Sequence, residues 1–130
     1  MSLMNENSLV KHMSSIYDKM TDTENEVAHY FKKRNIRWVF HFPVFVKDEE
    51  EIPRLYAPDF YIPKLGLFIE VCGSMKFNYQ HRNKVYKKNG IPVVFLHYYK
   101  HPKEWKSYLA KRIAEIEKQR ETESKKLRDF

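Results

Sequence analysis

The sequence predicts an α/β domain in which a mixed β-sheet of about four strands is flanked by helices. Hydrophobic periodicity along the chain gives the element order α–α–β–β–β–α–β–α. The segment from Leu67 to Leu96 has the pattern of a strand–helix–strand unit, which implies a right-handed parallel crossover. The two strands expected before its helix look like a hairpin. Antiparallel strands joined to a parallel crossover form a mixed sheet with helices on its faces.

Length and composition indicate one globular domain. The chain has 130 residues, of which 42% are hydrophobic and 15% aromatic, so it can bury a substantial core. We expect a single domain over residues 1–130, with a core of about residues 21–100 and a C-terminal helix of about residues 102–126.

Two helices are expected before the first strand. Apolar residues at helical spacing predict a helix over residues 8–19. Thr21 and Glu24 then match a capping box, in which the two side chains satisfy unpaired amides at a helix start. The apolar spacing that follows predicts a second helix over residues 22–34.

Three strands are expected next. Residues 37–46 are rich in aromatic and β-branched side chains, which favour a strand, and Pro43 within them indicates an edge, a bulge or a break. An acidic turn leads to a second strand over residues 55–62. A tight turn then joins it to an apolar strand over residues 67–72.

The last third of the chain predicts a helix, a strand and a helix. Residues 77–89 carry a helical pattern that ends at Asn89-Gly90, where glycine suits a left-handed helix cap. The apolar run over residues 91–96 is typical of a strand covered on both faces. From Pro102 a long helix carries one apolar stripe that fades beyond Glu117, so we expect its end to project or fray.

Nothing in the sequence points to a membrane or to secretion. No apolar run approaches the roughly 18 residues that a membrane span needs, and the N-terminus shows no secretory signal. Cys72 is the one cysteine, so no internal disulfide can form, which fits a reducing compartment. We expect an intracellular, cytoplasmic protein without a membrane partner.

Charge is spread unevenly along the chain and favours a polyanionic partner. The net charge is +7, yet residues 1–65 hold 9 Lys and Arg against 10 Asp and Glu, whereas residues 66–130 hold 15 against 7. A basic half on a small domain points first to nucleic acid. The alternative is a solubilising surface along the charged C-terminal helix.

Asp59 and Glu70 are the strongest functional signal. Glu70 is a lone carboxylate within the apolar strand 67–72, and burying it there costs several kcal/mol unless a cation or a partner compensates. Asp59 lies eleven residues earlier, a separation that a tight hairpin brings opposite Glu70. Two converging carboxylates suit Mg²⁺ or Mn²⁺, which can activate water for phosphodiester cleavage. The alternatives are pairing of Glu70 with Arg82 or Lys84 and a turn or strand-end role for Asp59.

These motifs together resemble the PD-(D/E)xK nuclease superfamily, and most of all its small restriction-endonuclease-like and very-short-patch-repair-like members. The resemblance rests on Pro-Asp at 58–59, Glu-Val-Cys-Gly at 70–73 and Gly-Ile-Pro-Val-Val at 90–94, and it runs from about Thr21 to Leu96. It implies a restriction-endonuclease-like sheet and a metal-dependent endodeoxyribonuclease that acts on DNA. Such nucleases often act as dimers, so a homodimer is a candidate assembly.

The resemblance also implies further site residues. Family members place a glutamate on the first core helix, and Glu24 falls at that position as an outer metal ligand. Alternatively, Glu24 serves only in the capping box, and Glu26 is then the candidate ligand on this helix. The family lysine two residues after the second acid is Cys72 here. A thiol cannot replace an ammonium group in polarising water or holding a phosphate.

Three explanations of this departure stay open. The lysine has moved to Lys76 or Lys84; or catalysis runs without it, supported by His81 or Gln80; or the site is degenerate and the domain only binds nucleic acid. An RNA-processing nuclease is a further alternative, because the carboxylates do not discriminate the sugar. The candidate catalytic residues are Asp59, Glu70, Glu24, Lys76 and His81, and the candidate phosphate contacts are Arg82, Lys84, Lys87 and Lys88.

Overall fold

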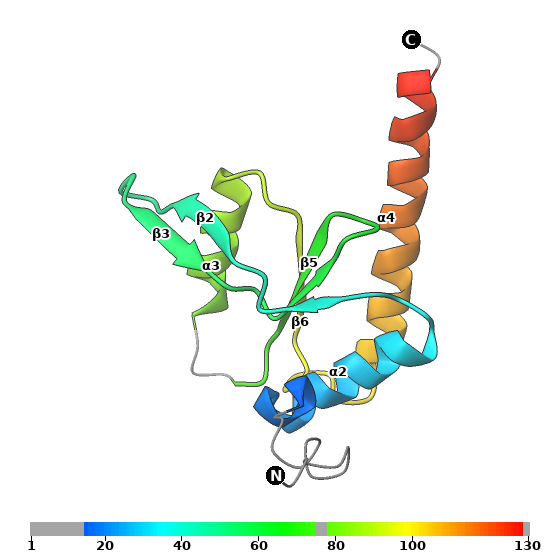
Figure 1. Cartoon of the computed structure of the whole chain (residues 1–130). Coiled ribbons are helices and arrows are strands. Elements are labelled where there is room, and N and C mark those ends of the chain that lie inside the picture. The colour runs from blue at the N-terminus through cyan, green and yellow to red at the C-terminus, as the bar shows by residue number, and fades with distance from the viewer. Residues whose placement is uncertain (1–14, 75–77, 129–130) are drawn as a thin grey trace, which may run out of the picture.

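The computed structural model describes residues 15–74 and 78–128, which form a mixed α/β structure (Figure 1). A short 3₁₀ helix, η1, spans Ile16–Lys19. The helices are α2 (Asp22–Lys33), α3 (Tyr79–Lys88) and α4 (Trp105–Arg128), and the strands are β1 (Val39–Phe40), β2 (Val44–Lys47), β3 (Pro53–Tyr56), β4 (Phe60–Ile62), β5 (Leu67–Val71) and β6 (Val93–Leu96).

The main sheet has four strands in the order β1-β4-β5-β6. Strands β1, β4 and β5 are antiparallel neighbours, whereas β6 pairs parallel to β5. The mixed four-stranded sheet expected from the sequence is therefore confirmed. So are the β4–β5 hairpin and the parallel pairing of the two strands that α3 connects.

Helices cover both faces of this sheet. One face packs against α2 and α4 in a core that includes Phe31, Ile69 and Leu109. On the other face lies α3, whose Tyr86 ring is 6.1 Å from that of Phe95 on β6. Strands β2 and β3 lie on the same side as α3 (Figure 1), and the rings of Tyr56 and Tyr86 are 5.6 Å apart.

Each of the first two expected strands is broken in two, and for the first of them a break at Pro43 was one of the expected outcomes. The single strand predicted over residues 37–46 divides into β1 and β2 at His41, which has a φ of 53°. The strand predicted over residues 55–62 divides into β3 and β4 just before Asp59. Proline has no N–H for a strand ladder, and Pro43 and Pro58 lie at the two breaks.

The two breaks set a separate hairpin, β2–β3, outside the main sheet. We call residues 42–58 the hairpin arm. The His41 N–H donates to the Asp59 carbonyl oxygen at 3.0 Å and so closes the base of the arm. The arm therefore leaves and rejoins the sheet at His41 and Asp59.

The helix ends follow the local signals closely. Thr21 and Glu24 form the expected capping box at the start of α2. Gly90, with a φ of 66°, follows α3 where a left-handed residue was expected. Helix α4 runs on to Arg128, beyond the expected end near 126, and its last turns extend past the sheet (Figure 1). Most of the helix predicted over residues 8–19 lies outside the described residues.

Within the described part of the chain, no helix combines the length and the apolar character needed to cross a membrane.

Candidate metal centre

The β4–β5 hairpin brings Asp59 and Glu70 side by side, as their spacing predicts. Phe60 pairs with Ile69, so the next residues outward along the hairpin are Asp59 and Glu70. The Asp59 N–H donates to Glu70 Oε1 at 3.0 Å, and the Val71 N–H donates to Asp59 Oδ2 at 2.7 Å. Each carboxylate thus binds the backbone of the opposite strand, which fixes both side chains where the ladder ends.

Glu70 has a cationic partner within the protein. The residue is only 5% exposed, and its Oε2 lies 2.8 Å from Nε of Arg82 on α3. Burial raises the pKa of Glu70, and the guanidinium of Arg82 opposes that shift. Arg82 in turn lies over the Tyr56 ring, 4.6 Å from its centroid. Of the alternatives raised by the sequence, pairing with Arg82 is the one observed, and it leaves Lys84 uninvolved.

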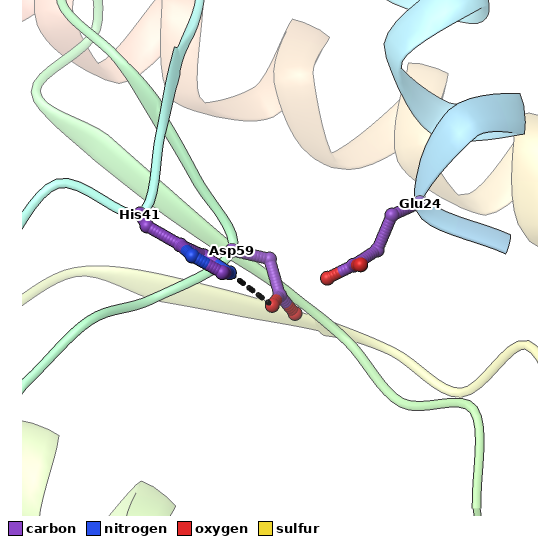
Figure 2. Close-up of side chains that lie close together, drawn as sticks. All are labelled: Glu24, His41 and Asp59. Atoms are coloured by element: carbon purple, nitrogen blue, oxygen red, sulfur yellow. Dashed lines mark ion pairs between the residues drawn. The ribbon is translucent and has the colours of Figure 1, made fainter. Parts of the chain in front are cut away.

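A second group forms around Asp59 and includes a residue that the sequence did not single out. Glu24, His41 and Asp59 each offer one ligand atom, and these atoms all lie within 4.8 Å of one another. His41 Nε2 is 3.8 Å from Asp59 Oδ1 (Figure 2). The three side chains come from the first turn of α2, the end of β1 and the residue before β4, and the carboxyl groups of Glu24 and Asp59 point toward one another (Figure 2).

Local interactions position each member of this cluster. Glu24 Oε1 accepts a hydrogen bond from the Thr21 N–H at 2.8 Å, which holds the carboxylate at the helix start. The His41 ring stacks on Phe40, with centroids 3.8 Å apart, and about half of its side chain stays exposed. Asp59 is anchored through the Val71 N–H. The cluster is therefore preorganised, with one side open to solvent at His41.

The charges in the cluster are arranged as they would be around a cation. Burial raises the pKa of Asp59 to about 8, and a hydrogen bond with the Glu24 carboxyl group and the charge of Glu70 add to this shift. A cation bound beside Asp59 would oppose this shift, because it favours the ionised carboxylate. Two carboxylates and an imidazole are ligands for divalent metal ions. The arrangement can hold such an ion.

Metal-free protein is expected to lose stability as the pH rises, because Asp59 is buried close to two other carboxyl groups. A folded-state pKa of about 8, above the usual 3.8, stabilises the fold below about pH 4, and this contribution is lost as the pH rises toward 8. In EDTA, the free energy of unfolding should therefore fall more for wild type than for Asp59→Asn between pH 5 and pH 8. Urea titrations at the two pH values measure the difference.

The matched control for that measurement is Glu121→Gln, which removes a charge from an exposed position of α4. It should keep the wild-type dependence on pH. Equal dependence in wild type and Asp59→Asn would show that Asp59 is ionised in the folded protein at pH 5.

Cys72 lies where the resemblance implies a lysine, and its thiol is in the unreactive, protonated form. Its side chain is fully buried, and burial raises the pKa of the thiol to about 12, with the charges of Glu70 and Asp59 adding to the shift. A neutral thiol neither holds a phosphate nor polarises water. The role assigned to the family lysine is therefore not supplied at this position.

A thiol reagent provides a direct check of that environment. Because the thiolate is the reacting form, native Cys72 should react with a disulfide reagent at pH 8 on the order of 10³-fold more slowly than in denatured protein. Absorbance of the released thiol follows both reactions. Comparable rates would mean that Cys72 is accessible and ionised.

The remaining predicted site residues lie apart from the cluster. His81 faces the turn of the hairpin arm, with Nδ1 3.9 Å from Glu49 Oε2. Lys88 donates to the Asp48 carbonyl oxygen and pairs with Glu51. Lys84 and Lys87 are exposed on α3 and make no ion pair with a described residue. Lys76 lies outside the described residues.

The sequence around His41 carries a signal of its own. It is the one polar residue within the aromatic run from Trp38 to Phe42, and it directly precedes the break before Pro43. A polar side chain in such a run is an anomaly of the same kind as Glu70. Its partner Asp59 lies eighteen positions later, beyond the reach of local patterns.

Comparisons of the chain with protein-family models, with curated proteins and with solved structures found no match.

Proposed function

We propose that this protein is a metal-dependent endodeoxyribonuclease with a restriction-endonuclease-like fold. The observation that carries the proposal is the meeting of the Glu24 and Asp59 carboxyl groups beside His41. Three segments that are distant in sequence converge there, and each side chain has the chemistry of a metal ligand. Carboxylates kept close together within a fold are costly unless a cation or a shared proton compensates for them.

In this proposal Glu24, His41 and Asp59 hold Mg²⁺ or Mn²⁺. Such an ion supplies an activated water and neutralises charge that builds on the scissile phosphate. Glu70 is a positioning residue, because it binds the Asp59 N–H and is itself neutralised by Arg82. The placement of Asp59 and Glu70 at the end of an antiparallel hairpin, followed by a parallel crossover, supports the proposed fold.

A plasmid-nicking assay tests the proposal. Wild type should convert supercoiled DNA to nicked or linear DNA with Mg²⁺ or Mn²⁺ and not with EDTA. Asp59→Asn, which keeps the size of the side chain, should lower the rate at least about 100-fold, since changes even to groups that support metal ligands cost 10- to 100-fold. Glu121→Gln is the matched control. No cleavage by wild type with any divalent metal, or unchanged cleavage by Asp59→Asn, would disprove the proposal.

A second candidate is a non-catalytic nucleic-acid-binding domain of the same fold. It is favoured by the neutral, buried Cys72 at the position of the family lysine. The ion pair of Glu70 with Arg82 also favours it. DNA binding that is sensitive to salt, needs no metal and leads to no cleavage would support it. Duplex, single-stranded and branched DNA, compared with RNA in the same assay, distinguish an RNA-processing nuclease from both.

A further inference from the structure

A large cleft lies between α2 and the beginning of α4, on the opposite side of the sheet from α3. Its volume is about 1200 Å³. Four exposed lysines line it: Lys32 and Lys33 at the end of α2, Lys103 in the turn before α4 and Lys106 in the first turn of α4. The phosphate contacts expected from the sequence lie on α3 instead.

The positive charge of this cleft is not neutralised by the described residues. None of the four lysines forms an ion pair there, and Glu26, the one carboxylate in the described lining, accepts a hydrogen bond from the Tyr98 hydroxyl at 2.9 Å. Other basic side chains are paired, as Arg112 is with Glu115 and Arg120 is with Glu123. Four unpaired ammonium groups around one hollow attract an anion.

The wall of the cleft contributes aromatic surface. The half-buried Tyr98 lines it, and so do Tyr30 and Trp105, which are 8% and 3% exposed. Aromatic side chains beside lysines are typical of surfaces that bind unpaired bases and their phosphates.

The cleft runs along the face of α2 that is turned away from Glu24. At 3.6 residues per turn, its lining residues Glu26, His29 and Lys33 lie about 140–200° around the helix axis from Glu24. A chain held in the cleft therefore lies across α2 from the candidate metal centre.

We propose that this cleft binds a single-stranded segment of nucleic acid across α2 from the candidate metal centre, an inference that rests on the proposed nuclease function. Pockets for small ligands usually measure about 300–1,000 Å³, so this cleft exceeds that range. Lysines on both sides of the cleft suit a backbone with repeated phosphates. The nuclease would then act on unpaired DNA or at a junction between single and double strands.

Fluorescence anisotropy in EDTA tests this binding without any cleavage. Labelled dT20 should bind the wild type more tightly than a 20-base-pair duplex. The variant Lys32→Ala/Lys33→Ala/Lys103→Ala/Lys106→Ala should lose at least about tenfold in affinity for dT20, and its salt dependence should become shallower by up to about 2.8 in log–log slope if each lysine contacts one phosphate.

The matched control removes four other exposed lysines: Lys64→Ala/Lys118→Ala/Lys125→Ala/Lys126→Ala. It changes the net charge equally, so it should keep most of the affinity if the position of the charge matters. Equal loss in both variants, no loss in the cleft variant or no binding of dT20 by wild type would overturn the inference. So would equal competition by poly-glutamate, which would indicate an acidic protein partner. If the wild type nicks plasmid DNA but gives any of these results, binding of nucleic acid in the cleft is disproved and the nuclease proposal still holds.

Discussion

Mn²⁺ is expected to stabilise the wild-type protein, and His41→Ala is expected to remove about half of that effect or more. An ion that binds only the folded state at 100 times its dissociation constant adds about 2.7 kcal/mol to the free energy of unfolding. If the loss of the imidazole weakens binding 10- to 100-fold, the same Mn²⁺ concentration adds only about 0.4–1.4 kcal/mol. Urea titrations with and without Mn²⁺ measure both values.

His41 is well suited to this test because it distinguishes two sites that share Asp59. His41 is half exposed, so its truncation should leave the fold intact. His101→Ala, which removes an exposed histidine near the start of α4, is the control and should respond to Mn²⁺ as the wild type does. If Mn²⁺ stabilises His41→Ala as much as the wild type but does not stabilise Glu70→Gln, the ion lies between Asp59 and Glu70, the pair predicted from the sequence.

Replacement of Arg82 by methionine is expected to lower the free energy of unfolding by about 3–5 kcal/mol. Glu70 is almost fully buried, and Arg82 is the cation beside it. Methionine keeps much of the apolar contact with Tyr56 and Tyr86 but leaves the carboxylate without its counter-charge. Urea denaturation in EDTA at pH 7 measures the loss.

Two further variants separate the charge effect from lost packing. In Glu70→Gln/Arg82→Met no charge stays buried, so most of the stability should return. Arg112→Met breaks the more exposed pair with Glu115 and should cost no more than about 1 kcal/mol. An equally small loss in Arg82→Met would mean that Glu70 is neutral in the folded protein or is neutralised by another group.

The parts of the fold that depend on neighbouring residues were predictable from the sequence. The capping box of Thr21 and Glu24, the end of α3 at Gly90 and the β4–β5 register each rest on residues close together in the chain. The opposition of Asp59 and Glu70 follows from that register, so it too was predictable.

The candidate metal centre was only partly predictable, because it depends on how distant segments pack. Glu24 was expected near the site only through the family resemblance, and His41 was not expected there at all. Pro43 indicated an edge, a bulge or a break within residues 37–46, but no local pattern placed a positive φ at His41. The choice of Arg82 over Lys84 as partner of Glu70 also depended on the rotation of α3 about its axis. The nuclease activity and the identity of the ion stay predictions.

The closure of the hairpin arm between His41 and Asp59 has a mechanical consequence. An ion held by both residues would link the two ends of the arm, because it joins the points where residues 42–58 leave and rejoin the sheet. Linkage then requires reciprocity: a partner that pulls the arm aside weakens the hold on the ion, and the ion resists that pull by the same free energy. Phe45 and Leu55 are exposed and lie opposite one another on the arm, so they form an apolar surface that such a partner can contact.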